Sequence, residues 1–131
     1  MKLKHITVGI GTIKEGLDEF ERVIKGIERG HAPKPHTPST HFVSLDAMLK
    51  VLTPRRLELL KIVRERTPAS LYALAHMAGR DMKNIHQDVM LLERLGFIQL
   101  THQRTSRRNV VPHVAYDKFR VDLPFAHLTH A

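Results

Sequence analysis

The apolar residues between Thr53 and Leu95 recur at helical spacing in three successive stretches, which Thr67-Pro68 and Gly79 separate. Proline and glycine interrupt helices, and Thr53, Ser70 and Asp81 stand where a helix N-cap is needed. The pattern therefore predicts three consecutive helices, over residues 54–66, 71–78 and 82–95, with a tight glycine turn before the third.

The third helix places four apolar residues on one face, at spacings of three, four and three: Met82, Ile85, Val89 and Leu92. A rotation of 100° per residue then turns Lys83, Asn84, Gln87 and Arg94 to the opposite face, with Arg80 just before the helix. Asn and Gln can pair bidentately with adenine, while Arg and Lys reach guanine edges or phosphates. The helix therefore carries a candidate DNA-reading face.

Three further residues of this helix do not belong to either face in the same projection. Asp88 projects sideways, where it can pair within the protein, and Met90 and Leu91 lean outward. The two apolar side chains could meet another segment, a partner subunit or a thymine methyl group, and the sequence leaves these alternatives open.

A basic hairpin is predicted after the third helix. Residues 97–102 and 110–116 have the pattern of strands, and the polar segment 103–109 between them has no apolar residue to bury. This segment carries Arg104, Arg107 and Arg108, which predicts contacts with phosphates or the adjacent minor groove. Helix, short helix, glycine turn, longer helix and basic hairpin follow the order of a winged helix-turn-helix.

The flanking segments complete an α+β chain, in which a winged helix-turn-helix core carries an N-terminal strand-helix arm. Residues 5–10 alternate like a strand, and a helix follows from Thr12 to about Gly30, with Ile13, Leu17, Phe20, Ile24 and Ile27 at helical spacing. A strand is expected over residues 42–45, with Ser44 capping a helix through Leu52. The expected parts are the arm (1–30), a Pro-rich linker (31–41), the DNA-binding domain (42–117) and a C-terminal strand or tail (118–131).

Charge and composition narrow the class of protein. Lys and Arg number 21 against 13 acidic residues, for a formal net charge of +8, which favours polyanionic partners, double-stranded DNA first among them. The absence of cysteine removes disulfides and thiol catalysis and is compatible with a reducing cytoplasm. We expect no signal peptide and no membrane span, because apolar runs of the required length are missing.

Enzyme and metal chemistry are not expected from the motifs. A nucleophile with its base, paired carboxylates and a phosphate-binding glycine loop are all missing at usable spacing, so no catalytic residue or cofactor is predicted. His31, His36 and His41 recur every five residues, but this spacing in an extended chain does not bring ligands together, so no metal site is predicted. His86, on the third helix, could titrate near neutral pH and make DNA binding pH-sensitive, although a plain polar contact is the simpler expectation.

The stretches LTPRRLELLKIV and LYALAHMAGRDMKNIHQDVMLLERLGFIQL, with the closing LERLGFI, resemble prokaryotic MarR-like winged-helix regulators. With the arm and the Pro-rich segment, LTPRRLELL and GRDMKNIHQDV resemble a group of transcriptional regulators encoded beside toxin genes. The resemblance implies that Arg80, Lys83, Asn84, His86 and Gln87 read DNA, and that the protein is an antitoxin repressing its own operon.

The expected function is sequence-specific binding of double-stranded DNA, as a repressor. We expect a homodimer, because one recognition helix reads too few base pairs for useful affinity. The expected interface is the arm, with or without residues 118–128, where Phe119, Val121 and Leu123 alternate like an edge strand; the alternative is that these segments pack on their own core. A second hypothesis makes the protein an antitoxin whose arm binds a cognate toxin, with DNA binding secondary.

Overall fold

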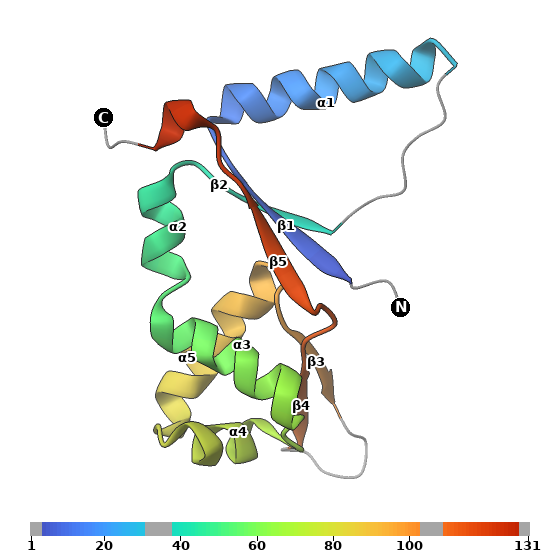
Figure 1. Cartoon of the computed structure of the whole chain (residues 1–131). Coiled ribbons are helices and arrows are strands. Elements are labelled where there is room, and N and C mark those ends of the chain that lie inside the picture. Colours follow the sequence, from blue (N-terminus) through green and yellow to red (C-terminus); the bar gives the residue numbers. More distant parts are fainter. Residues whose placement is uncertain (1–3, 31–37, 103–108, 129–131) are drawn as a thin grey trace.

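The computed structural model describes residues 4–30, 38–102 and 109–128, which form a mixed α+β fold (Figure 1). The α+β class predicted from the sequence is confirmed. The described elements, in chain order, are β1 (His5–Ile10), α1 (Ile13–Glu28), β2 (Ser39–Phe42), α2 (Leu45–Val51), α3 (Pro54–Arg66), α4 (Leu71–Ala78), α5 (Met82–Arg94), β3 (Gln99–His102), β4 (Val110–His113), β5 (Lys118–Asp122) and the short 3-10 helix η1 (Phe125–His127).

A three-stranded sheet joins the two ends of the chain. Its order is β2-β1-β5, and β1 runs parallel to both neighbours, so that Val8 lies opposite Thr40 on one side and Val121 on the other. The alternate residues Ile6, Val8 and Ile10 are 2%, 0% and 4% exposed, as the alternating pattern predicts. The N-terminal strand β1 therefore packs on the chain's own core, whereas β5 pairs with β1 at one edge of the sheet and its five residues remain exposed.

The strand β2 begins earlier than the sequence predicts. Residues 31–41 were expected to form an extended linker and residues 42–45 a strand, but β2 covers Ser39–Phe42 and Ser44 caps α2. Pairing with β1 causes the difference, because the Thr7 amide donates to the Pro38 carbonyl at 3.0 Å and the ladder continues to Phe42. Periodicity in a short polar segment does not reveal such a partner. Residues 31–37 lie outside the described part.

The helices α3 and α4 have the predicted bounds and α5 ends one residue earlier than predicted, at Arg94, and their caps explain these bounds. The hydroxyls of Thr53 and Ser70 and the carboxylate of Asp81 each accept a backbone hydrogen bond in the first turn. Pro54 occupies the first position of α3, and Gly79 ends α4 in the left-handed conformation, at φ 66°. The antiparallel strands β3 and β4 then form the predicted hairpin, in which β3 begins two residues later and β4 ends three residues earlier than expected.

The core face of α5 differs from the prediction in three residues. Ile85, Val89 and Leu92 are fully buried, but Met82 is 40% exposed because it occupies the first turn, before burial begins at Ile85. Met90 and Leu91, expected to lean outward, are both partly buried, and Met90 packs against the core.

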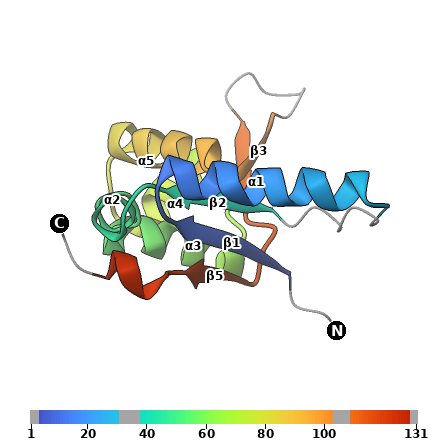
Figure 2. The ribbon, with the colours of Figure 1, turned by 90° about the horizontal axis from the view of Figure 1, so that it is seen from above.

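Helix α1 is formed as predicted but is not covered as an amphipathic helix usually is. Thr12 and Glu15 make a reciprocal capping box at its start, and Gly30, at φ 87°, follows its end. Its residues Leu17 and Phe20 remain 63% and 65% exposed. The helix lies across one end of the molecule, and the sheet separates it from α3, α4 and the hairpin (Figures 1 and 2).

Within the described residues, no helix combines the length and the apolar character required to cross a lipid bilayer.

Candidate nucleic-acid interface

The first two turns of α5 present a polar face to solvent. Lys83, Asn84, His86 and Gln87 are all exposed, whereas Ile85 between them is fully buried. One turn of an α-helix takes 3.6 residues, so residues 83, 84 and 87 lie together on the side opposite Ile85, Val89 and Leu92. Four of the predicted DNA-contacting residues are therefore brought together at the solvent side of one helix.

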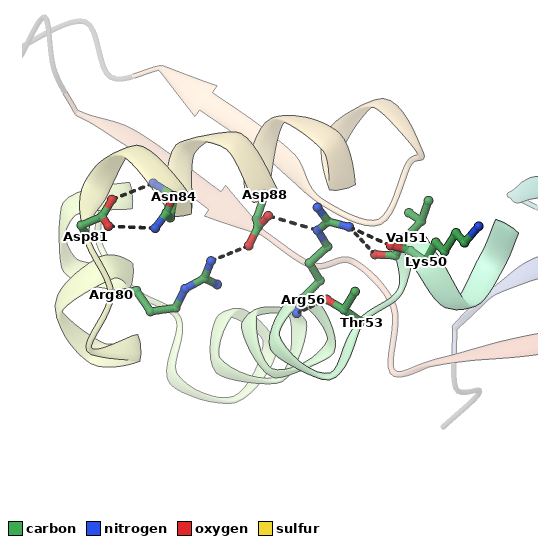
Figure 3. Close-up of polar contacts among 8 residues, drawn as sticks. All are labelled: Lys50, Val51, Thr53, Arg56, Arg80, Asp81, Asn84 and Asp88. Atoms are coloured by element: carbon green, nitrogen blue, oxygen red, sulfur yellow. Dashed lines mark hydrogen bonds and ion pairs between the residues drawn. The ribbon is translucent and has the colours of Figure 1, made fainter. Parts of the chain in front are cut away.

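The orientation of Asn84 is fixed by the cap of its own helix. Asp81 accepts the Asn84 amide N–H through Oδ1 at 2.9 Å and the side-chain Nδ2 through Oδ2 at 2.8 Å (Figure 3). A side-chain amide carries two N–H donors and an acceptor oxygen. One N–H and the oxygen of Asn84 therefore stay available to a ligand, as recognition of adenine requires.

A buried carboxylate holds α5 against the rest of the helical layer. Asp88 is 9% exposed, and its two oxygens accept from Arg56 Nε at 3.0 Å and from Arg80 Nη2 at 2.7 Å (Figure 3). Arg56 lies on α3 and Arg80 lies in the turn between α4 and α5. Asp88 therefore connects α5 to α3 and to the turn that precedes α5, confirming that it pairs within the protein.

Arg56 extends this connection to a fourth element. Its Nη1 donates to the carbonyls of Val51 at 2.9 Å and Lys50 at 3.3 Å, which lie at the C-terminal end of α2. Carbonyls at that end of a helix have no partner inside the helix, and a cation there also interacts favourably with the helix dipole. One guanidinium thus ties α2, α3 and α5 together.

The ionisation of Asp88 reflects the same contacts. Burial by itself raises the pKa of the carboxyl group, but the hydrogen bonds and charges of Arg80 and Arg56 outweigh burial, so the pKa lies below its ordinary value. Asp88 is therefore charged at neutral pH and forms a charge-assisted network with two arginines.

The placement of Arg80 corrects the expectation that its side chain joins the exposed face. The side chain is 16% exposed and points inward to Asp88, and its Nε and Nη1 atoms are buried without a hydrogen-bond partner. A buried carboxylate one helical turn from the exposed face attracts this arginine more strongly than solvent does. Arg80 positions the helix in this structure and does not present its guanidinium at the surface.

The remaining predicted residues lie further from this face or outside the described chain. Arg94 is exposed in the last turn of α5, about two turns beyond Gln87. Arg104, Arg107 and Arg108 lie outside the described residues; the strands that lead to them, β3 and β4, are paired in register from Gln99–His113 to His102–Val110.

The sequence interpretation missed the role of Arg56, to which it assigned no contact. A signal existed in the position of its partner, because Asp88 follows Ile85 by three residues and precedes Leu92 by four, at the edge of the apolar stripe. An acidic residue within a buried stripe requires a cationic or hydrogen-bonding partner. The identity of that partner depends on how α3 crosses α5, which the spacing does not specify.

Of the three histidines of the Pro-rich segment, only His41 lies within the described residues. His41 lies on β2 with Nε2 3.0 Å from the Gly11 carbonyl oxygen, and so joins β2 to the residue that follows β1. His31 and His36 are outside the described residues. His127, near the C-terminus, lies 2.8 Å from Glu15 at the start of α1, a contact that the sequence interpretation missed.

The fold and the exposed helix face define a small α+β protein with a solvent-facing polar surface on α5. The chain belongs to the HVO_A0114 family, whose model matches residues 51–121, more than half of the chain. The match covers α3, α4, α5, the hairpin and nearly all of β5, and the family name states no activity or ligand. No curated protein matches the sequence.

Proposed function

We propose that this protein is a sequence-specific double-stranded DNA-binding transcriptional regulator, in which α3, α4, α5 and the β3–β4 hairpin act as a winged helix-turn-helix. In this proposal α5 enters the major groove and the arginine-bearing hairpin tip contacts the backbone or the minor groove. The resemblance of the GRDMKNIHQDV segment to regulators encoded beside toxin genes favours repression of the protein's own operon.

One observation carries the proposal. The exposed first two turns of α5 hold Lys83, Asn84, His86 and Gln87, while the opposite side of the helix is fully buried and fixed through Asp88. A recognition helix needs both features, because its side chains must reach base edges and its axis must be braced against the protein. The net charge of +8 adds the general attraction to a polyanion.

Each exposed residue has a role suited to its chemistry. Asn84 and Gln87 have the donor and acceptor pair that recognises adenine, and Asn84 is already oriented by Asp81. Lys83 supplies a charge for a phosphate or a guanine edge, and His86 lies beside them as a polar contact. Arg80 is assigned no base contact, since Asp88 holds it inside the protein.

The test is binding to duplex DNA from the upstream region of its own gene, compared with a scrambled duplex at two salt concentrations. We expect the native chain to prefer the cognate duplex and the Asn84→Ala/Gln87→Ala variant to lose that preference. A bidentate contact contributes roughly 1–3 kcal/mol of discrimination, which corresponds to a loss of about tenfold or more.

A charge-matched pair of variants controls for general attraction. Lys83→Gln and Lys50→Gln remove the same charge, but Lys50 lies at the C-terminal end of α2 and its side chain points away from Asn84 (Figure 3). We expect only Lys83→Gln to weaken binding. It should also reduce the slope of the logarithm of the binding constant against the logarithm of salt concentration by about one, the change expected for one lost phosphate contact. Equal binding of both duplexes, unchanged by the α5 variants, would contradict the proposal.

A further inference from the structure

The exposed apolar side of α1 needs a partner. Leu17, Phe20, Ile24 and Ile27 keep 63%, 65%, 39% and 44% of their surface exposed, and Val23 beside them keeps 50%. The helix is strongly amphipathic, and an amphipathic helix ordinarily buries its apolar stripe. A contiguous exposed stripe of large apolar side chains marks an interaction surface.

The spacing of the stripe indicates what kind of partner fits it. The four residues follow one another at intervals of three, four and three, which is the heptad pattern of a seam between two helices. A seam of two residues per heptad is narrower than the stripe of a helix that packs on a sheet. The stripe of α1, defined by Leu17, Phe20, Ile24 and Ile27, therefore suits one further α-helix.

We propose that α1 pairs antiparallel with α1 of a second copy of this chain. In the register that places Leu17 opposite Ile27 of the second copy, Phe20 lies opposite Ile24. The two-fold axis then generates each of these two pairs a second time, so that every residue of the stripe has an apolar partner. The same surface serves both copies, and no other chain is required to cover it.

The charges at the two ends of α1 favour the antiparallel direction. Lys14 lies in the first turn and Glu28 is the last residue of the helix, so each has the sign that its own helix dipole disfavours. Both occupy the same flanking position of the heptad, and both are exposed. Antiparallel pairing brings Lys14 of each copy within about 3 Å along the axis of Glu28 of the other.

A parallel pair lacks this complementarity. It would gather two Lys14 side chains at one end and two Glu28 side chains at the other, with both helix dipoles aligned. In the antiparallel pair, Glu21 meets its counterpart near the axis, where each is already paired with Lys25 of its own helix at 2.9 Å. The charge pattern of α1 is therefore compatible with its own reversed copy.

Sedimentation equilibrium of the full chain tests the seam without DNA, so its result is independent of the proposed DNA binding. We expect twice the 15.0 kDa mass of the chain for the native protein and a single-chain mass for Phe20→Glu/Ile24→Glu. Leu49→Glu is the control, because Leu49 is 54% exposed on α2, away from the stripe. A native chain that stays monomeric at about 100 μM, or a double-Glu variant that stays dimeric, would overturn the proposal.

A charge exchange tests the direction and leaves the apolar stripe intact. Lys14→Glu and Glu28→Lys each place like charges across the antiparallel seam, so each single variant is expected to dimerise several-fold more weakly. A mixture of the two single variants, and the double variant K14E/E28K, restore opposite charges and are expected to recover the native affinity. Each change also improves the interaction with the helix dipole, so circular dichroism should show no loss of helix.

Parallel pairing predicts a different result, because exchanging a charge at one end of the pair leaves like charges there. Single variants that dimerise as well as the native chain would therefore exclude the antiparallel seam. A dimer that is insensitive to both the apolar and the charge substitutions would assign dimerisation to another surface, and would also overturn the proposal.

Discussion

Asp88 is the residue whose removal should most disturb the candidate interface. The Asp88→Ala change leaves the Arg80 and Arg56 guanidinium groups without their shared carboxylate in a largely buried site. Breaking one side of a buried ion pair costs roughly 3–5 kcal/mol, and we expect a loss of about 3 kcal/mol in the free energy of unfolding in urea.

The matched control for this prediction is Lys50→Ala, which removes an exposed ion pair with Asp46 within α2. Such pairs contribute about 0.5 kcal/mol or less. Similar losses for the two variants would mean that the network of Asp88 contributes no more than a surface pair.

The same carboxylate predicts a dependence on pH. The pKa of Asp88 is lower in the folded protein than its ordinary value, so its stabilising effect is present above an unfolded pKa of about 3.9 and disappears as the pH falls through the folded value. The difference in unfolding free energy between the native chain and Asp88→Asn should therefore be constant near neutral pH and shrink below about pH 4. A difference that grows on acidification would contradict this assignment.

At the level of single elements, two glycines should respond to alanine in opposite directions. Gly79 ends α4 at φ 66°, and Gly16 lies inside α1; an added Cβ would meet no atom within 4 Å at either position. Gly79→Ala should destabilise the protein by about 1–2 kcal/mol, because the left-handed conformation is strained for alanine. Gly16→Ala should stabilise it by up to about 1 kcal/mol, because alanine favours the helix.

Thermal unfolding of the two variants beside the native chain measures both effects, since neither change adds or removes a packing contact within the described residues. Stabilisation by Gly79→Ala would mean that the turn between α4 and α5 does not require a left-handed residue.

The sequence predicts the helices well and their surroundings less well. The bounds of α3 to α5 follow from local chemistry, because Thr53, Ser70, Asp81 and Gly79 act within one turn of their own position. Periodicity shows which residues share a helix face, but it does not show what covers that face. For this reason the exposed face of α5 was predicted, whereas the inward course of Arg80 and the pairing of Arg56 with Asp88 were not.

The strands show the same limit over a longer range. The alternation of Ile6, Val8 and Ile10 predicts a strand with one buried face, but its partners β2 and β5 come from residues more than 30 and 110 positions away. Nothing in a short polar stretch such as Ser39–Phe42 indicates a parallel neighbour, so the sequence interpretation assigned most of it to a linker.

For the whole molecule, the sheet predicts that the family-matched segment alone does not fold as it does in the full chain. A fragment of residues 51–121 lacks β1 and β2, so β5 would lose its ladder and Phe119 would lose its cross-strand neighbour Ile6. We expect the fragment to unfold at a much lower urea concentration than the full chain. The slope of its unfolding free energy against urea concentration should also be smaller, because less surface becomes exposed on unfolding. Equal midpoints for the two would show that α3, α4, α5 and the hairpin are an independent unit.

Because β1 is the central strand, the three-stranded sheet cannot be completed until β5 has been synthesised. Two hydrogen bonds join Lys4 and Asp117, which are 113 positions apart: the Asp117 amide donates to the Lys4 carbonyl at 2.9 Å, and the Lys4 amide donates to the Asp117 side-chain carboxylate at 3.0 Å. Ribosomes add roughly 5–20 residues per second, so β1 waits about 6–20 s after its own synthesis for the residues of β5. Throughout that interval one edge of β1 is an open template for other nascent chains.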